Sequence, residues 1–260
     1  MSLSVNHLNY IVGSKQLLND ISVVINEPKI IGIIGPNGAG KSTLVKCLSG
    51  LLETVNAIEL NGQKIESFSP AELAKIRAAL PQESHLTFPF PVKDVVGMSF
   101  AMSATSKQHQ DKLIHQCLKK VAAIELADRN FLSLSGGEKQ RVHLARIFAQ
   151  LMQHQTSNDM RFLMLDEPTA PLDMKHQFSL FKELKQLKFF NLSSIVVIHD
   201  INLAASYCDE IWVIDAGKLV SQATPQEVIS QNMMKQVFDV DVAISYHGQS
   251  AIPIINNPTN

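Results

Sequence analysis

The sequence has 260 residues, of which 45% are hydrophobic and 18% are charged, and its formal net charge is −1 at pH 7. This composition is typical of an ordinary globular protein with one large core or two lobes, and it argues against a disordered chain. The near-neutral charge, without a basic block, argues against direct nucleic-acid binding. No stretch approaches the roughly 18 apolar residues that a membrane span needs. If the protein acts at a membrane, we expect it to dock onto a separate spanning partner.

The three cysteines, Cys47, Cys117 and Cys208, are far apart in the sequence and lie within apolar patterns. Their odd number and spacing favour buried free thiols over a disulfide framework or a zinc site. The N-terminus lacks the charged start and apolar run of a secretory signal. Both features lead us to expect a reducing, cytoplasmic environment.

The first 25 residues alternate loosely between apolar and polar side chains, over 2–12 and again over 17–25. This pattern predicts two antiparallel strands joined by a polar turn near Gly13, forming a flap ahead of the next segment. Tyr10 could stack on a nucleotide base, because base recognition often uses an aromatic face. An ordinary strand aromatic explains Tyr10 equally well.

Residues 35–43 read GPNGAGKST and match the phosphate-loop pattern G-x-x-x-x-G-K-[ST]. An apolar run at 30–34 precedes the loop and an apolar helical pattern at 44–52 follows it, so strand, loop and helix come in the required order. Glycines let the backbone N–H groups point inward, and Lys41 brings a positive charge to the β and γ phosphates. A glycine-rich turn with an incidental lysine does not explain this order. The predicted ATP-binding residues are Gly35, Pro36, Asn37, Gly38, Ala39, Gly40, Lys41, Ser42 and Thr43.

The next segments change from strands to helices. Residues 57–60 and the Asn61-Gly62 turn predict a hairpin with a short partner strand. Ser69, with Glu72 three residues later, predicts a helix with a capping box that ends shortly before Pro81. From about 83 to 150 the apolar residues recur at helical spacing, which predicts a helical lobe inserted into the core. Within it, LSGGEKQ at 134–140 opens another helix.

The second half predicts the centre of a sheet. Residues 151–160 are polar and predict a loop extension. The short apolar runs 162–165, 194–198 and 211–214 are typical of buried strands. Because they alternate with helical segments, they favour a mainly parallel sheet covered on both faces. Thr224 to Glu227 starts one more helix, and we expect 241–260 to be a C-terminal tail.

Polar side chains follow two of these buried strands directly. Asp166 is placed to hold Mg²⁺, and the neighbouring Glu167 to polarise an attacking water. His199, after the next strand, could donate a hydrogen bond to the γ-phosphate. Each has a structural explanation alone, as a helix cap or an internally bonded histidine. Because parallel strands present their carboxyl ends at one edge, we expect all three near the phosphate loop.

These motifs together resemble the ATPase subunit of an ATP-binding cassette (ABC) transporter, over about residues 3–230. The resemblance identifies 35–43 as Walker A, Gln82 as the Q-loop, 134–140 as the signature, 162–166 as Walker B and His199 as the switch histidine. LSGGEKQ is the most specific of them. It can also be read as a capping box between Ser135 and Glu138, and both readings can hold.

The resemblance implies a P-loop NTPase of the α/β class, with a RecA-like sheet, an N-terminal antiparallel flap and an inserted helical lobe, in a single domain at 1–240. It implies ATP and Mg²⁺ as ligands, with Ser42, Gln82 and Asp166 at the metal and Glu167, His199 and Gln82 in catalysis. It also implies a head-to-tail homodimer in which the signature of one subunit closes over the partner's nucleotide. The signature residues are Ser135, Gly136, Gly137 and Glu138.

The sequence departs from the family pattern at two places. The D-loop is Ala-Pro-Leu-Asp at 170–173, which keeps Asp173 and stiffens the backbone before it. The adenine-stacking aromatic is not clearly aligned, because Tyr10 is about two positions early and Val12 stands near the expected place. We therefore expect altered communication between sites and leave the base contact open.

A single cassette without a fused membrane segment favours an importer ATPase. Three features resemble haem-importer ATPases: TFPFPV at 87–92, the polar segment 151–160, and Leu-Asp at 172–173 followed by His176-Gln177. We expect two permease copies, an indirect periplasmic haem-binding partner, no nucleic acid, and a peripheral location on the cytoplasmic face of the inner membrane. An iron-siderophore or cobalamin importer ATPase is the alternative. A soluble ABC ATPase of translation or DNA repair, or a P-loop kinase, fits less well.

Overall fold

The computed structural model describes residues 2–82, 86–101, 105–153, 159–246 and 252–256. Its central sheet has the strand order β10-β9-β3-β8-β7-β6. All neighbours in it run parallel except β9 and β10, which are antiparallel. The predicted mainly parallel sheet is therefore confirmed. Its strands are β3 (Ile30–Ile34), β6 (Arg77–Leu80), β7 (Arg161–Leu165), β8 (Leu192–Val197), β9 (Glu210–Asp215) and β10 (Lys218–Ala223).

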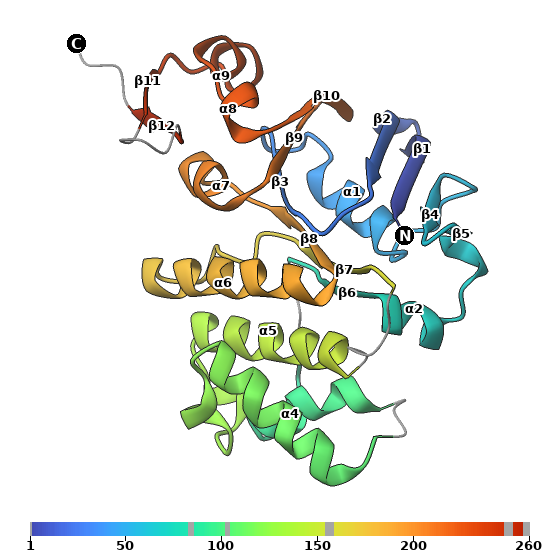
Figure 1. Ribbon diagram of the computed structural model, residues 1–260, viewed down its shortest axis with the longest axis vertical. Helices are drawn as coiled ribbons and strands as arrows, with labels where there is room; N and C mark the ends of the chain where they lie inside the picture. The colour runs from blue at the N-terminus through green and yellow to red at the C-terminus, as the bar shows by residue number, and fades with distance from the viewer. Residues whose placement is uncertain (1, 83–85, 102–104, 154–158, 247–251, 257–260) are drawn as a thin grey trace.

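The predicted N-terminal flap is a second, antiparallel sheet with the order β2-β1-β4-β5. Asn61 and Gly62 both have positive φ, at 51° and 81°, as a tight hairpin turn requires. Figure 1 shows this sheet at the right, beside α1 (Lys41–Leu48). Its strands are β1 (Leu3–Val12), β2 (Lys15–Ile25), β4 (Ile58–Leu60) and β5 (Gln63–Lys64).

The two faces of the central sheet belong to two separate hydrophobic clusters. Along β3, Ile30 and Ile34 enter the cluster that includes the helical lobe, while Ile31 and Ile33 enter the cluster under the flap. Side chains alternate between the faces of a strand, so one apolar run fills both cores. This is why the central strands read as continuous apolar segments, and the expectation that the sheet is covered on both faces is confirmed.

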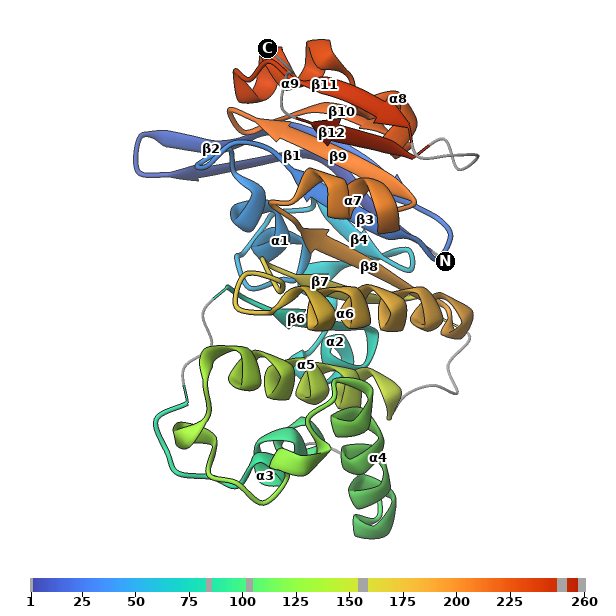
Figure 2. The same ribbon diagram turned by 90° about the vertical axis from the view of Figure 1, so that its left-hand side faces the viewer.

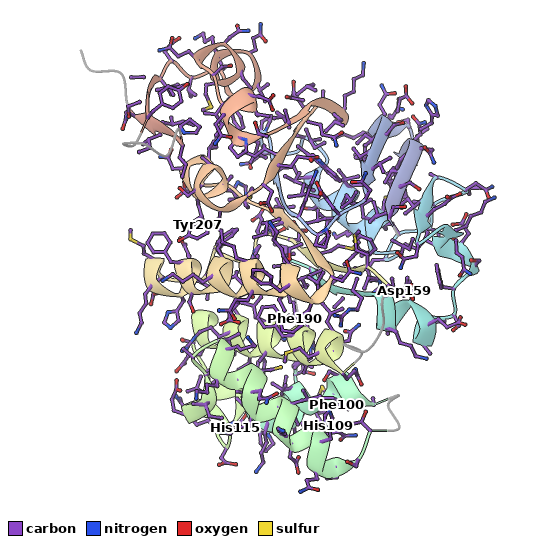
Figure 3. The ribbon with its side chains drawn as sticks, viewed as in Figure 1. Phe100, His109, His115, Asp159, Phe190 and Tyr207 are labelled. Atoms are coloured by element: carbon purple, nitrogen blue, oxygen red, sulfur yellow. The ribbon has the colours of Figure 1, made fainter. Side chains whose placement is uncertain are left out.

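The helical lobe lies at the bottom of Figures 1 and 2, below the sheet. It contains α3 (Val92–Gly97), α4 (Lys107–Lys120) and α5 (Gly136–Met152). Helix α6 (Met174–Leu187) lies between the lobe and the sheet, and α7 (Ile201–Tyr207) covers the same sheet face further up. Figure 3 shows Tyr207 between α7 and α6, where its ring centroid is 5.0 Å from that of Phe181. The remaining helices are α2 (Pro70–Ile76), α8 (Pro225–Val228) and α9 (Gln231–Phe238), and the 3-10 turns are Ile65–Ser67, Met98–Phe100, Ile124–Leu126, Phe131–Ser133 and Lys188–Phe190.

The structure differs from the expectations in five places. The helix predicted up to Pro81 ends at Ile76, and β6 follows as an edge strand because pairing with β7 outweighs the local helical preference of Arg-Ala-Ala-Leu. The helix predicted over 44–52 ends at Leu48. The C-terminal tail contains a β-hairpin, β11 (Ala243–Tyr246) with β12 (Pro253–Asn256), and the chain also forms β10, which was not predicted. The predicted loop 151–160 begins two residues late, after α5, and 154–158 lie outside the described residues.

Candidate active site

The phosphate loop is packed so tightly that two of its glycines cannot be replaced. A Cβ on Gly35, at φ 151°, would lie 2.0 Å from the Ile214 carbonyl oxygen. A Cβ on Gly40, at φ 105°, would lie 2.7 Å from the Leu17 carbonyl oxygen. The loop is thus wedged between β9 and β2. The peptide of Gly217 closes it further by donating to the Ala39 carbonyl at 2.9 Å.

Helix α1 begins at the end of this loop with its first turn open. Its N-cap is Gly40, and among the described residues no side chain caps it and no acidic residue lies in its first turn. The N–H groups of a first helical turn have no partner within the helix and carry a partial positive charge. The start of α1 can therefore bind an anion with its backbone, as a phosphate site needs.

Lys41 is held at the centre of the loop. Its side chain is only 5% exposed, and Nζ donates to the carbonyl oxygens of Gly35 and Pro36, both at 2.8 Å. Burial lowers the pKa of Lys41, and the nearby carboxylates of Glu167 and Asp166 oppose that shift. The two carbonyls and two acids keep a cation in place where the triphosphate is expected.

Asp166 and Ser42 meet beside the loop, as predicted. Ser42 Oγ donates to Asp166 Oδ1 at 3.0 Å, and Asp166 is 1% exposed. Burial raises the pKa of Asp166, and the Ser42 hydrogen bond partly opposes this. Within the described residues, Asp166 Oδ2 is buried without a hydrogen-bond partner. An orphan buried carboxylate oxygen beside a hydroxyl fits a hard divalent cation, which prefers oxygen ligands.

Glu167 joins the predicted catalytic residues into one cluster. Its Oε1 lies 2.6 Å from Nε2 of His199, and its Oε2 accepts a hydrogen bond from Gln82 Nε2 at 3.1 Å. The three residues follow β6, β7 and β8, whose carboxyl ends meet at one edge. The Glu167 side chain is 16% exposed and that of His199 is 49% exposed. Gln82 and Glu167 also line the cavity above the phosphate loop, whereas His199 lies outside that lining.

A cavity above the loop brings most predicted residues together. It is lined by Lys15, Leu17, Asn37, Gly38, Ala39, Gly40, Lys41, Ser42, Thr43, Gln82 and Glu167. Lys15 and Leu17 were missed, because their place depends on the β1–β2 register, which local sequence does not reveal. Tyr10 is not part of this lining; it packs against the hydrophobic cluster under the flap. Its base-stacking role stays a prediction that this arrangement does not support.

The signature residues lie elsewhere. Ser135 caps α5: its N–H and Oγ both donate to Glu138 Oε2 at 2.8 Å, and the Glu138 N–H donates back to Ser135 Oγ at 3.4 Å. The predicted capping box is thus present. These contacts hold the pKa of Glu138 below its usual range. Residues of the signature and D-loop line a second cavity, formed by Ser135, Gly137, Glu138, Arg141, Pro171, Leu172, Asp173 and His176.

The two cavities share no residue within the described chain. The D-loop instead contacts the signature of its own subunit, because a Cβ on Gly137 would lie 2.8 Å from the Pro171 carbonyl oxygen. Asp173 caps α6 by accepting from the His176 N–H at 2.9 Å, a bond that holds the pKa of Asp173 below its usual range. Each chain therefore has a phosphate face and a separate signature face.

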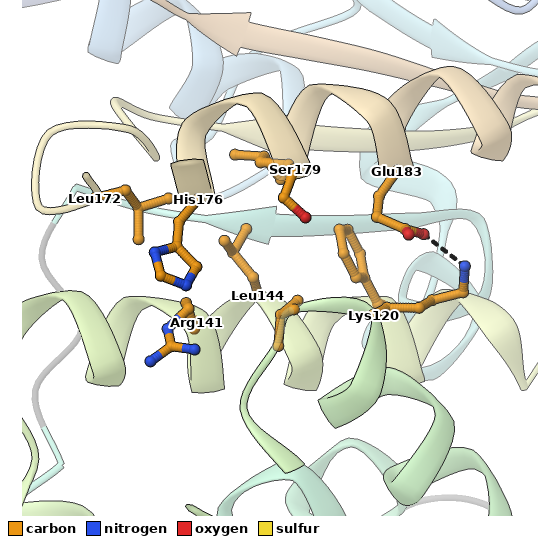
Figure 4. Close-up of a pocket in the computed structure, with 10 residues that line it drawn as sticks. Lys120, Arg141, Leu144, Leu172, His176, Ser179 and Glu183 are labelled. Atoms are coloured by element: carbon orange, nitrogen blue, oxygen red, sulfur yellow. Dashed lines mark hydrogen bonds and ion pairs between the residues drawn. The ribbon is translucent and has the colours of Figure 1, made fainter. Parts of the chain in front are cut away.

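The signature face continues along the contact between lobe and core. Figure 4 shows this contact, with Arg141 of α5 and His176 of α6 at one end and the Lys120–Glu183 ion pair at the other. Lys120 Nζ lies 2.5 Å from Glu183 Oε2, and both side chains are largely shielded. Gln140 also donates to the Pro168 carbonyl at 3.0 Å, which ties the signature helix to the residue after Glu167.

Comparison with known proteins decides the family. The family model described as "ABC transporter" matches residues 18–170, which is more than half of the chain. The chain belongs to the ABC transporter family. Among its relatives, this ABC protein is 38% identical over 255 residues to the "Hemin import ATP-binding protein HmuV" of Aliivibrio fischeri, covering 98% of this chain and 97% of that one. The predicted ATPase class is confirmed.

Solved ABC structures share the fold. One is an inward-facing ABC transporter described as of the metal-chelate type, with a TM-score of 0.77 at 22% identity, covering 98% of this chain and 95% of that one. Another is a dimeric bacterial ABC transporter cassette, with a TM-score of 0.74 at 24% identity, covering 86% of this chain and 98% of that one. Across the described parts of this ABC protein, no helix is both long and apolar enough to traverse a bilayer.

Proposed function

We propose that this ABC ATPase energises haem uptake through a separate permease. The observation that carries the ATPase part is the cluster of Glu167, His199 and Gln82 beside the buried Lys41. The haem part rests on near-full-length likeness to relatives named hemin import ATP-binding protein, at 36–38% identity. An iron-siderophore importer is the alternative that the growth test below distinguishes.

The geometry supports a division of labour in ATP hydrolysis. The open first turn of α1 and Lys41 bind the phosphates, and Glu167 accepts the proton of the attacking water. His199, which lies against Glu167, donates to the γ-phosphate as its charge grows. Ser42 and Asp166, with the Gln82 side-chain oxygen, would hold Mg²⁺, which neutralises charge on the β and γ phosphates when bound.

Two subunits are needed for a complete site in this proposal. Because the signature cavity and the phosphate cavity are separate in one chain, Ser135 and Gly137 close over a nucleotide only if it belongs to a second copy. A head-to-tail pair with two-fold symmetry brings both signatures onto both phosphate loops at once. The exposed start of α5, with its Ser135–Glu138 capping box, then adds its partial positive charge to the partner's triphosphate.

The segment after Gln82 supports docking to a permease. Phe88 is 65% exposed and Phe90 38% exposed, with ring centroids 6.1 Å apart. Backbone hydrogen bonds fix the conformation of this segment. The Phe90 carbonyl accepts from the Phe131 N–H at 2.9 Å, and the Phe90 N–H donates to the Phe88 carbonyl at 2.9 Å. Exposed aromatic anchors on a fixed loop are typical of binding hot spots. We infer two permease copies, a periplasmic haem-binding protein upstream, no nucleic-acid partner, and a peripheral place on the cytoplasmic face of the inner membrane.

Docking and catalysis can be tested apart. Phe88→Ala with Phe90→Ala should leave ATP hydrolysis by the free subunit unchanged, weaken permease binding and abolish stimulation by the permease. Phe189→Ala is the control, since Phe189 is 88% exposed in the turn after α6, outside this segment. Equal loss of permease binding in the control, or none in the double variant, would contradict the docking role.

The cargo test uses growth. Replacing Glu167 by Gln removes the general base, which typically contributes about 10²- to 10⁴-fold to the rate, while nucleotide binding and the closed dimer persist. Cells that carry Glu167→Gln should fail to grow on haem as sole iron source and still grow on a ferric siderophore. Failure on the siderophore alone would replace the haem assignment by the siderophore one. Undiminished turnover in the purified variant would remove the catalytic role of Glu167.

A further inference from the structure

The C-terminal hairpin of β11 and β12 lies against the helix that follows His199. Both ribbon views place the hairpin beside α7, at the top of the molecule (Figures 1 and 2). Asn202 on α7 joins the two elements with paired bonds: its Nδ2 donates to the Ile255 carbonyl at 3.2 Å, and its Oδ1 accepts from the Ile255 N–H at 2.7 Å. One side chain thus binds both main-chain groups of one residue of β12.

The link acts on the first turn of α7, where it is closest to His199. Asp200 is the N-cap of α7 and accepts from the Leu203 N–H at 3.0 Å, so α7 starts directly after the histidine. On the other side of His199, the Ile198 N–H donates to the Ile33 carbonyl at 3.1 Å. His199 therefore sits in a short connection between a strand fixed in the sheet and a helix braced by the hairpin.

The far end of α7 is anchored independently of the hairpin. Tyr207 packs on Phe181 at 5.0 Å and stacks near Phe178 at 6.2 Å between ring centroids, with Lys185 Nζ 4.9 Å from its ring. Breaking the Asn202 link therefore leaves the helix end held and loosens its start. The loosened part carries the connection that brings His199 within 2.6 Å of Glu167.

Apolar contact supports the brace as well. Ile244, Ile252 and Ile255 of the hairpin region pack against the cluster that contains Ile198, Leu203 and Ala204. Removing this apolar surface from water stabilises the contact. Apolar packing therefore holds the hairpin against α7, and the two Asn202 hydrogen bonds fix the position of Ile255 on this helix.

We propose that the C-terminal hairpin is a positioning element for His199, and that Asn202 is the positioning residue through which it acts. This inference rests on the proposed ATPase function and adds a control point to it that lies outside the nucleotide cavity. A partner or a modification that lifts the hairpin from α7 would slow hydrolysis without releasing ATP. The phosphate loop would be unaffected, because its close packing involves Leu17, Ile214 and Gly217 and not α7.

The first test is a kinetic comparison. Asn202→Ala removes the two hydrogen bonds between α7 and β12 and should lower kcat about 3- to 10-fold with KM for ATP unchanged. A chain ending at residue 242 should reproduce this split. Ser206→Ala is the matched control, since its Oγ donates to the Asn202 carbonyl within α7 and the residue is also exposed. A rise in KM, or an unchanged kcat, would overturn the proposal.

The second test separates positioning from general stabilisation. If Asn202 acts through His199, then Asn202→Ala should have no further effect on kcat in a His199→Ala background. An equal loss of kcat in both backgrounds would mean that the hairpin only stabilises the fold. The imidazole resonances of His199, assigned by comparison with His199→Ala, should shift in Asn202→Ala, while those of His7 on β1 stay in place.

The resonance measurement does not depend on turnover. Absent ATPase activity in the unmodified protein would refute the proposed function, and the His199 resonances would still decide the positioning role. Unmoved resonances with intact activity would refute the positioning role alone. Asn202→Asp, which keeps the acceptor for the Ile255 N–H, should give an intermediate shift and an intermediate kcat.

Discussion

The starts of α1 and α5 are both glycine-containing helix N-termini, and they differ in whether their backbone N–H groups are already satisfied. At α1 the N-cap is Gly40, with no side-chain cap and no acidic residue among the described residues of its first turn. At α5 Ser135 and Glu138 form a complete capping box. The first helix start is open to a phosphate of the nucleotide that the same chain binds. The second is self-satisfied and exposed, and it faces the D-loop.

The difference suggests how one fold makes two kinds of phosphate contact. The α1 start is locked by packing, because Gly35 and Gly40 touch backbone from β9 and β2. The α5 start is held by three hydrogen bonds at the surface, which in the proposed dimer would exchange with contacts to the partner's triphosphate. A fixed contact suits tight binding within one chain, and an exchangeable contact suits a partner that comes and goes.

The largest expected effect comes from disturbing the tightly packed phosphate loop at the start of α1. Gly35→Ala would place a Cβ 2.0 Å from a backbone oxygen of β9, so the loop must shift, and we expect ATP binding to be lost. Gly38→Ala is the matched control, because a Cβ there meets nothing within 4 Å and only the positive φ of 77° is unfavourable. That strain costs about 1–2 kcal/mol, so binding should weaken and remain measurable by calorimetry. Equal losses in both variants would show that packing is not the cause.

The next prediction tests whether the signature at the start of α5 completes the nucleotide site of a second chain. Lys41→Ala removes the buried cation and Ser135→Arg blocks the signature, so each homodimer should be inactive. A mixed dimer has one site with both lesions and one with neither. Each mixed dimer should therefore have up to half of the ATPase activity of an unmodified dimer, provided that one intact site turns over alone. Mixed dimers that form, by mass spectrometry, and hydrolyse no ATP would count against the trans arrangement or show that the sites are obligately coupled.

Most of this comparison could be predicted from the sequence, because both helix starts are local motifs. The phosphate loop and the capping box of Ser135 and Glu138 each lie within nine residues, and the structure places both as expected. Asp166, Glu167 and His199 could be placed together because each follows a buried apolar strand, and parallel strands share an edge.

What could not be predicted depends on pairing between distant segments. Strand β6 reads Arg-Ala-Ala-Leu, which has no β-branched residue, and it is a strand only because β7 lies beside it. The hairpin of β11 and β12 consists of two short strands whose apolar residues pack against a core cluster built from distant segments, α7 among them. Lys15 and Leu17 reach the nucleotide cavity through the β1–β2 register and through the contact of Leu17 with Gly40 and Gly217. No local pattern contains that information.

A smaller effect is expected from removing the carboxylate of Glu138 at the start of α5. Glu138→Gln keeps the capping hydrogen bonds and removes a negative charge beside the expected site of the partner's triphosphate. Exposed charge pairs are worth about 0.2–1 kcal/mol, so the ATP-dependent dimer should tighten about 1.4- to 5-fold. Arg129, 3.3 Å from Glu138, would then be free to add attraction. Sedimentation with ATP in a Glu167→Gln background measures this. Glu72→Gln, in the capping box of α2, is the control and should leave dimerisation unchanged.

The smallest expected effect is a difference in pH dependence, with opposite signs at the two helix starts. At α5, hydrogen bonds from Ser135 hold the pKa of Glu138 below its ordinary value of 4.5. The unfolded chain then binds more protons than the folded one near that pH. The stabilisation from Glu138 is fully present above about pH 4.5 and is lost as the pH falls through the lowered folded-state pKa. Acid therefore destabilises this helix start.

At α1 the sign is reversed, because burial raises the pKa of Asp166 above its ordinary value of 3.8. The folded protein then binds more protons than the unfolded chain, so the cost of the buried carboxylate is present at neutral pH and is relieved as the pH falls through the raised pKa. Asp166→Asn should raise the thermal midpoint at pH 7 and make the decline between pH 6 and 3.5 steeper. Glu138→Gln should make that decline shallower. The control is Glu227→Gln at α8, where hydrogen bonds from Thr224 lower the pKa as at α5, so it should follow Glu138→Gln. Parallel curves for Asp166→Asn and Glu138→Gln would show that the two helix starts do not differ in this way, since only opposite pKa shifts make the two slopes diverge.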